Sequence, residues 1–174
     1  MSSSLRSIGA AERRARLAVR HRLAPTARAG DVVDVASDLV ALHATDPASV
    51  YLAAAARMRA PTIRAVERAL YDDRSLVRLL GMRRTMFVVP VELVPTIHAA
   101  CTRAIAANER RKLLAQITAA EALPPGTEEA WLDRVGDETV AALEVRGEAL
   151  ASDLTADVSD LGTEMWLGGE GRWT

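Results

Sequence analysis

Two short runs of apolar residues, Leu76-Val77-Arg78-Leu79-Leu80 and Thr85-Met86-Phe87-Val88-Val89, decide the fold class of this chain. Gly81-Met82-Arg83-Arg84 separates the two runs, and Pro90 follows the second. Runs of this length that are bounded by Gly and Pro are typical of the two strands of a β-hairpin. Because the segments on either side have helical spacing, we expect a mainly α chain with small β hairpins.

Four helices are expected before the hairpin, and their starts carry clear signals. The first covers residues 9–24. The second begins at Asp31 and keeps apolar residues at helical spacing as far as Leu42. The third begins at Asp46-Pro47 and the fourth at Pro61-Thr62. Asp and Thr side chains cap the free N–H groups of a helix, and Pro fits its first position because it has no N–H.

Further helices are expected after the hairpin, over residues 91–118, 128–145 and 148–158. Thr127 precedes the second of them as an expected cap. Pro124-Pro125 marks the best domain boundary, because the charge balance changes sign near it. The last ten residues, 165–174, look like a strand and a glycine turn.

Helices followed by a two-stranded hairpin describe a winged helix, a helix-turn-helix relative in which the hairpin forms the wing. We therefore expect a tandem winged-helix architecture. Residues 1–121 would hold the N-terminal helix, the first winged-helix domain and a long connecting helix. Residues 122–174 would begin a second winged-helix domain that stops before its wing is complete.

Charge is distributed unevenly along the chain. Residues 1–113 carry 19 Arg or Lys and ten Asp or Glu, whereas residues 114–174 carry three Arg and 13 acids. This difference indicates an anionic partner for the basic part. Two solvated faces of one protein explain it equally well.

Composition excludes several classes of protein. The single cysteine, Cys101, rules out an internal disulfide and a cysteine-based zinc site, and no His, Cys or carboxylate set has metal-ligand spacing. We therefore expect no metal and no cofactor. No apolar run approaches the roughly 20 residues of a membrane helix, and the N-terminus lacks the apolar block of a secretory signal. A cytoplasmic protein without a membrane partner is expected, and its oligomeric state stays open.

Part of the sequence resembles a known family. The residues that carry the resemblance are Leu39-Val40-Ala41-Leu42-His43-Ala44-Thr45-Asp46-Pro47, Tyr51-Leu52, Ser75-Leu76-Val77-Arg78 and Met82-Arg83-Arg84-Thr85-Met86-Phe87-Val88-Val89. They resemble the winged-helix DNA-binding proteins related to the AlkZ-type DNA glycosylases, which use tandem winged-helix domains to remove alkylated bases or unhook crosslinks. The resemblance is sharp over residues 31–90. Family members continue beyond residue 174, so the chain looks like an N-terminal fragment.

The resemblance also implies a catalytic pair. Characterised family members have Gln-x-Gln or Gln-x-Asp where this sequence has His43 and Thr45. A neutral imidazole and a hydroxyl can hold a water near the anomeric carbon, and a cationic alkylated purine leaves with little acid help. The alternative is structural: a His near a helix C-terminus interacts well with the helix dipole, and Thr45 is then a junction residue. Asp46 fits a helix cap better than a catalytic carboxylate.

Three arginines of the expected hairpin, Arg78, Arg83 and Arg84, are candidate DNA contacts. Wing arginines contact phosphates or enter the minor groove. The alternative is a charged hairpin edge that prevents strand pairing between molecules.

Three classes of function follow from the sequence, and the third of them is a purely structural protein module. The first is a winged-helix protein that binds double-stranded DNA and resembles glycosylases, with catalysis left open because His43 and Thr45 depart from the family pair. The second is a non-enzymatic winged-helix regulator or architectural protein. An enzyme needs a pocket beside the pair, whereas a regulator needs only an exposed recognition helix.

Overall fold

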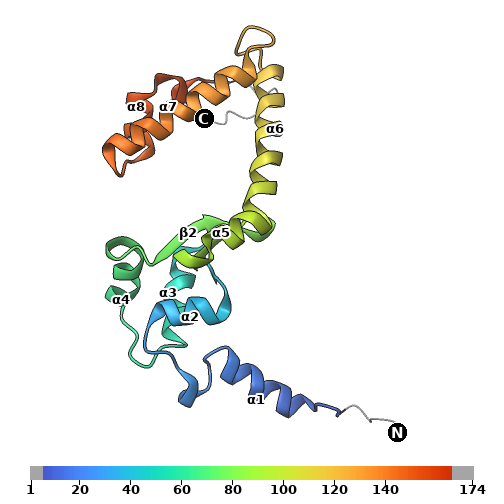
Figure 1. The fold of residues 1–174 in the computed structure, drawn as a ribbon, viewed down its shortest axis with the longest axis vertical. Coiled ribbons are helices and arrows are strands. Elements are labelled where there is room, and N and C mark those ends of the chain that lie inside the picture. Colours follow the sequence, from blue (N-terminus) through green and yellow to red (C-terminus); the bar gives the residue numbers. More distant parts are fainter. Residues whose placement is uncertain (1–5, 166–174) are drawn as a thin grey trace. The chain divides into compact units, whose positions relative to one another are not determined.

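A computed structural model of the chain describes residues 6–165 (Figure 1). The chain divides into two compact units, Met1–Ile105 and Ala106–Thr174. This division falls inside a long helix, whereas the sequence suggested a boundary at residues 121–122. Helices dominate, and the strands of the described part form one small antiparallel sheet. The expected class, mainly α with a small β hairpin, is confirmed.

The N-terminal helices begin close to where the sequence indicates. Helix α1, Ala10–Arg20, ends short of Pro25 and buries none of its residues. Helix α2, Val32–Leu39, begins after Asp31, whose carboxylate accepts a hydrogen bond from the Val33 N–H at 2.6 Å.

The second helix is shorter than expected, and the difference changes the setting of His43. Val40 follows α2 with a φ of +70°, which ends the helix because L-residues cannot continue a right-handed helix there. Leu42 and His43 then form strand β1, Leu42–His43. Leu42 is buried, as its spacing indicated, but as a strand residue. His43 is therefore not at a helix C-terminus, and the helix-dipole explanation for it is wrong.

The sheet has the strand order β1-β3-β2. Strands β2, Leu76–Leu80, and β3, Met86–Pro90, form the expected hairpin. β1 pairs with the other side of β3, placing Leu42 opposite Val88 and His43 opposite Phe87. A 3₁₀ turn over Met82–Arg84 connects β2 and β3.

Two more helices pack with α2 against this sheet. Helix α3, Pro47–Ala55, is capped by Asp46, whose carboxylate accepts from the Ala48 N–H at 3.1 Å. Helix α4, Ile63–Glu67, is capped by Thr62 and continues into a π turn over Arg68–Asp72. The buried core joins these helices to one face of the sheet and comprises Ala29, Val32, Val35, Ala36, Leu42, Ala44, Val50, Ala54, Met58, Val66, Ala69, Leu76 and Val88.

The expected helix over residues 91–118 is present with an irregular middle. It runs as a 3₁₀ turn, Val91–Leu93, then α5, Val94–Ile97, a π turn, His98–Thr102, and α6, Arg103–Ala119. The Thr102 hydroxyl donates to the Leu80 carbonyl at 2.6 Å, so this helical segment contacts the end of β2.

The remaining helices are α7, Glu128–Arg146, and α8, Ala151–Asp157. Thr127 precedes α7, but its hydroxyl donates to the Pro124 carbonyl at 2.7 Å and does not cap the helix. The strand and glycine turn expected near the end fall almost wholly on residues 166–174, outside the described residues. Within residues 6–165, no helix is long and apolar enough to cross a membrane, and no three His, Cys, Asp or Glu side chains group as metal ligands would.

Candidate catalytic strand, hairpin tip and pocket

His43 lies at the exposed end of β1. Strand pairing sets it opposite Phe87, the only phenylalanine of the chain, and the two rings meet edge to face with centroids 5.4 Å apart. His43 Nε2 lies 3.4 Å from Thr45 Oγ1. The structure thus brings together the two side chains that the sequence singled out as a pair.

Backbone pairing with β3 fixes the position of Thr45. The Ala44 N–H donates to the Met86 carbonyl at 2.8 Å, and the Met86 N–H donates to Thr45 Oγ1 at 3.3 Å. The Thr45 hydroxyl oxygen therefore accepts from the backbone, which leaves its proton for His43 Nε2 or for a water. The Thr45 hydroxyl thus takes the place of a backbone carbonyl as the acceptor at the end of the β1–β3 pairing. This hydrogen bond holds the Thr45 side chain in position.

Ser49 supports the same loop, and sequence reasoning missed it. Its hydroxyl lies 2.8 Å from the His43 carbonyl and 2.6 Å from the Asp46 carbonyl. The start of α3 is thereby tied to the end of β1. The position of Ser49, three residues after the capping Asp46, could have indicated this role, because hydroxyls in the first turn of a helix often bond nearby backbone groups.

The tip of the hairpin carries Arg83 and Arg84, both exposed. Their φ angles are +56° and +59°, in the left-handed region. Two consecutive positive-φ residues in a hairpin turn are usually Asn-Gly, and other L-residues lose roughly 1 kcal/mol each in this conformation. Arg22 and Arg74 also have positive φ, so this conformation alone assigns no role to the two arginines of the tip.

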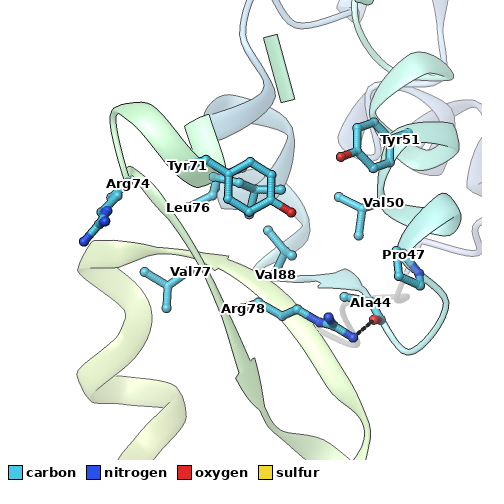
Figure 2. A pocket seen from close by; sticks show the side chains of 11 residues that line it. Ala44, Pro47, Val50, Tyr51, Tyr71, Arg74, Leu76, Val77, Arg78 and Val88 are labelled. Atoms are coloured by element: carbon cyan, nitrogen blue, oxygen red, sulfur yellow. Dashed lines mark hydrogen bonds between the residues drawn. The ribbon is translucent and has the colours of Figure 1, made fainter. Parts of the chain in front are cut away.

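Arg78 takes a different position from the other two candidate arginines. It lies on β2, and its guanidinium reaches across the sheet to donate to the Ala44 carbonyl at 3.1 Å (Figure 2). Ala44 stands between His43 and Thr45. Arg78 therefore holds the backbone that carries the candidate pair, whereas Arg83 and Arg84 project from the turn.

A pocket of about 340 Å³ lies behind the candidate strand. Helix α3, the π turn and strands of the sheet form its walls (Figure 2). It is lined by Ala44, Pro47, Val50, Tyr51, Leu70, Tyr71, Arg74, Leu76, Val77, Arg78 and Val88. His43 and Thr45 do not line it, because successive residues of an extended strand face opposite sides and the pocket lies on the side of Ala44.

Both tyrosines of the chain belong to this pocket. Burial, together with nearby Tyr71 and Glu67, raises the pKa of Tyr51, so its phenol stays protonated and available as a hydrogen-bond donor at neutral pH. Tyr71 is 66% exposed and forms part of the rim. The sequence pointed to Tyr51 through its place on the apolar face of the third expected helix and through the family resemblance, and it gave no signal for Tyr71.

Two arginines of the second unit, Ala106–Thr174, are held in ion pairs. Arg134 pairs with Glu138 and Asp160, and these hydrogen bonds raise its pKa. Arg146 pairs with Asp157 and thereby lowers the pKa of that carboxyl. Acids outnumber basic residues in this unit.

Comparison with known families adds to this geometry. The family model described as DNA glycosylase AlkZ-like matches residues 36–174. The match includes the candidate strand, the hairpin and the second unit. No curated protein and no solved structure matches the chain.

Proposed function

Because the chain belongs to the AlkZ-like DNA glycosylase family, we propose that it binds duplex DNA and hydrolyses the N-glycosidic bond of an alkylated base, with His43 and Thr45 holding the attacking water. One observation carries this proposal. His43 Nε2 and Thr45 Oγ1 lie 3.4 Å apart at the exposed end of β1, and the sequence resemblance places them at the positions of the family's catalytic pair. A water on this side of the strand can bond both atoms.

The proposed reaction needs little from these two side chains. The bond between the anomeric carbon and the base nitrogen breaks, and the base, cationic while attached, leaves as a neutral molecule. The water oxygen bonds the anomeric carbon and loses a proton to His43 Nε2 or to solvent. The backbone bond from Met86 orients Thr45 Oγ1, whose hydroxyl positions the water.

DNA binding in this proposal rests on the first unit. We assign α2, α3 and α4 to the helical part of a winged helix and the β2–β3 hairpin to its wing. Arg83 and Arg84 at the tip contact phosphates. The duplex is attracted by the excess of positive charge over residues 1–113, most of whose basic residues lie in the first unit. A phosphate contact by Arg78 stays a prediction, since its guanidinium bonds the Ala44 carbonyl.

A second candidate is a non-enzymatic winged-helix DNA binder. The observation that favours it is the chemistry of the pair: neither His43 nor Thr45 is an amide or a carboxylate, and the pocket opens on the other side of their strand. Such a protein keeps the DNA contacts and has no base to release. The cytoplasmic location expected from the sequence suits both candidates and stays a prediction.

Base release from a duplex that contains 7-methylguanine tests the proposal, with duplex binding measured in parallel. His43→Ala should lower release by about 100-fold or more, the scale of a general base, while binding is retained. His43→Gln restores the family residue and should keep activity. His98→Ala changes an exposed histidine away from the site and is the matched control.

Equal release by the wild-type protein and His43→Ala would contradict the catalytic role. If neither protein releases a base from the methylated duplex or from a crosslinked one, while both bind, the non-enzymatic candidate is correct.

A further inference from the structure

The pocket behind β1 has properties of a ligand site that base excision does not use. Its volume of about 340 Å³ falls within the range of small-molecule sites, roughly 300–1,000 Å³. Seven aliphatic residues form most of its lining, with two tyrosines and two arginines as the polar groups. An apolar cavity with a few convergent polar side chains is the usual form of such a site.

The charge of the pocket is positive. Arg74 and Arg78 are among its lining residues, and no carboxylate is. Glu67 lies near enough to Tyr51 to affect the pKa of the phenol, but it does not line the cavity. Of the two arginines, Arg78 reaches across the sheet toward Ala44, whereas Arg74 points away from the two phenols (Figure 2).

The guanidinium of Arg78 is preorganised to bind an anion. One of its N–H groups donates to the Ala44 carbonyl at 3.1 Å. A guanidinium has five N–H donors in a planar fork, so Arg78 can keep this bond and still hold a carboxylate with two others. The bond to Ala44 fixes the arginine across the sheet face, which lowers the entropy lost when a ligand binds.

The remaining walls favour a flat ring. Figure 2 shows the two phenol rings facing the same space, with Val50 and Val88 beside it. Aromatic rings bury large apolar areas and stack or meet edge to face with other rings. The phenol of Tyr51 adds one hydrogen-bond donor to this apolar surface.

We propose that this pocket binds a small planar aromatic carboxylate, with its ring against Tyr51, Tyr71 and Val88 and its carboxylate on Arg78. The site is separate from the proposed water-holding pair, which lies on the other side of the strand. Its occupation does not require DNA, so the proposal holds or fails independently of base excision.

Amide NMR of the full chain, titrated with naphthoate, tests this proposal. Naphthalenemethanol has the same ring without the negative charge and is the ligand control. Naphthoate should shift the amides of Ala44, Tyr71 and Val77 in a saturable way. We expect naphthalenemethanol to bind at least about five-fold more weakly, because the charge-assisted bonds to Arg78 are lost.

Variants locate the site. Arg78→Gln should weaken naphthoate at least about five-fold, whereas Arg83→Gln, a change of the same kind at the hairpin tip, should leave its affinity unchanged. Tyr71→Ala removes an exposed part of the wall without touching the core and should also weaken binding. Tyr71→Ala still tests the position of the site if Arg78→Gln does not fold.

Three results would overturn the proposal: no saturable shift with naphthoate, shifts confined to residues away from the pocket, or equal affinity in a folded Arg78→Gln or Tyr71→Ala protein. Equal binding of naphthoate and naphthalenemethanol would overturn the assignment of an anion.

Discussion

Arg78 and Ala44 are 34 residues apart in sequence, yet the guanidinium of one donates to the carbonyl of the other at 3.1 Å. The two residues belong to opposite sides of the central strand, since Arg78 lies on β2 and Ala44 follows β1. This bond fixes the backbone between His43 and Thr45. The geometry of the candidate pair therefore depends on a residue that lies on a different strand.

Replacing Arg78 by Ala should lower the free energy of unfolding by about 1 kcal/mol, the usual net value of one such hydrogen bond. Urea denaturation measures this change. Arg83→Ala, which removes an exposed arginine from the turn, should stay within about 0.5 kcal/mol of the wild type. Equal effects of the two substitutions would mean that the bond to Ala44 has no energetic role.

Val40→Gly should stabilise the protein. Val40 has a φ of +70° and is 52% exposed, so the substitution relieves backbone strain and loses little buried surface. The relief exceeds the entropy that glycine adds to the unfolded chain, and a net gain of about 0.5–1 kcal/mol is expected. Thermal unfolding checks it, with Val140→Gly, at an exposed valine inside α7, as the control that should destabilise by about 1 kcal/mol.

Gly81→Ala should destabilise the protein by about 1–3 kcal/mol. A Cβ at this position would lie 2.9 Å from Phe87 Cδ2, and the ring must shift. Gly136→Ala provides the opposite case, because nothing lies within 4 Å of the added Cβ and the residue is inside α7. That substitution should stabilise by about 0.5–1 kcal/mol, and a loss of stability at both sites would disprove the steric explanation.

Arg83→Ala combined with Arg84→Ala should weaken binding to all duplex sequences by a similar factor. The slope of log K against log salt should become less steep by about 1–2, because each lost phosphate contact retains its counterions. Fluorescence anisotropy at several salt concentrations measures the slope. Arg134→Ala, in the second unit, should leave the slope unchanged. An unchanged slope in the double variant would exclude Arg83 and Arg84 from the DNA interface.

The ion pair between Arg146 and Asp157 should make part of the stability depend on pH. The hydrogen bond from Arg146 lowers the pKa of Asp157 in the folded protein. A lowered folded pKa stabilises above the unfolded pKa, about 4, and the contribution disappears as pH falls through the folded value. Asp157→Asn should therefore lower the Tm at pH 7. This effect should begin to shrink below about pH 4 and vanish below the lowered folded pKa of Asp157. Asp137→Asn, which alters an exposed acid of α7, is the control.

Much of the fold follows from local signals in the sequence. The caps at Asp31, Asp46 and Thr62 start three helices because each side chain binds an N–H group within three residues of itself. The hairpin follows from two β-type runs joined by a short turn. Such features depend on neighbours in sequence and can be predicted without knowing the tertiary structure.

Strand β1 could not be predicted in the same way. It has two residues, and its partners in β3 are more than forty positions away. The spacing of Leu42 fits both the end of a helix and a buried strand position, and only the positive φ of Val40 distinguishes them. Likewise, the contact between His43 and Thr45 could be anticipated from the resemblance, whereas the pocket and the bond from Arg78 to Ala44 arise from tertiary packing.

Phe87 connects the turn of the hairpin to the end of β1. Its ring packs closely against Gly81, at the base of the turn, and meets the imidazole of His43 edge to face. A displacement of the turn can therefore be transmitted to His43 through the Phe87 ring alone. If a duplex pulls on Arg83 and Arg84, substitutions at the turn and at His43 should be energetically non-additive.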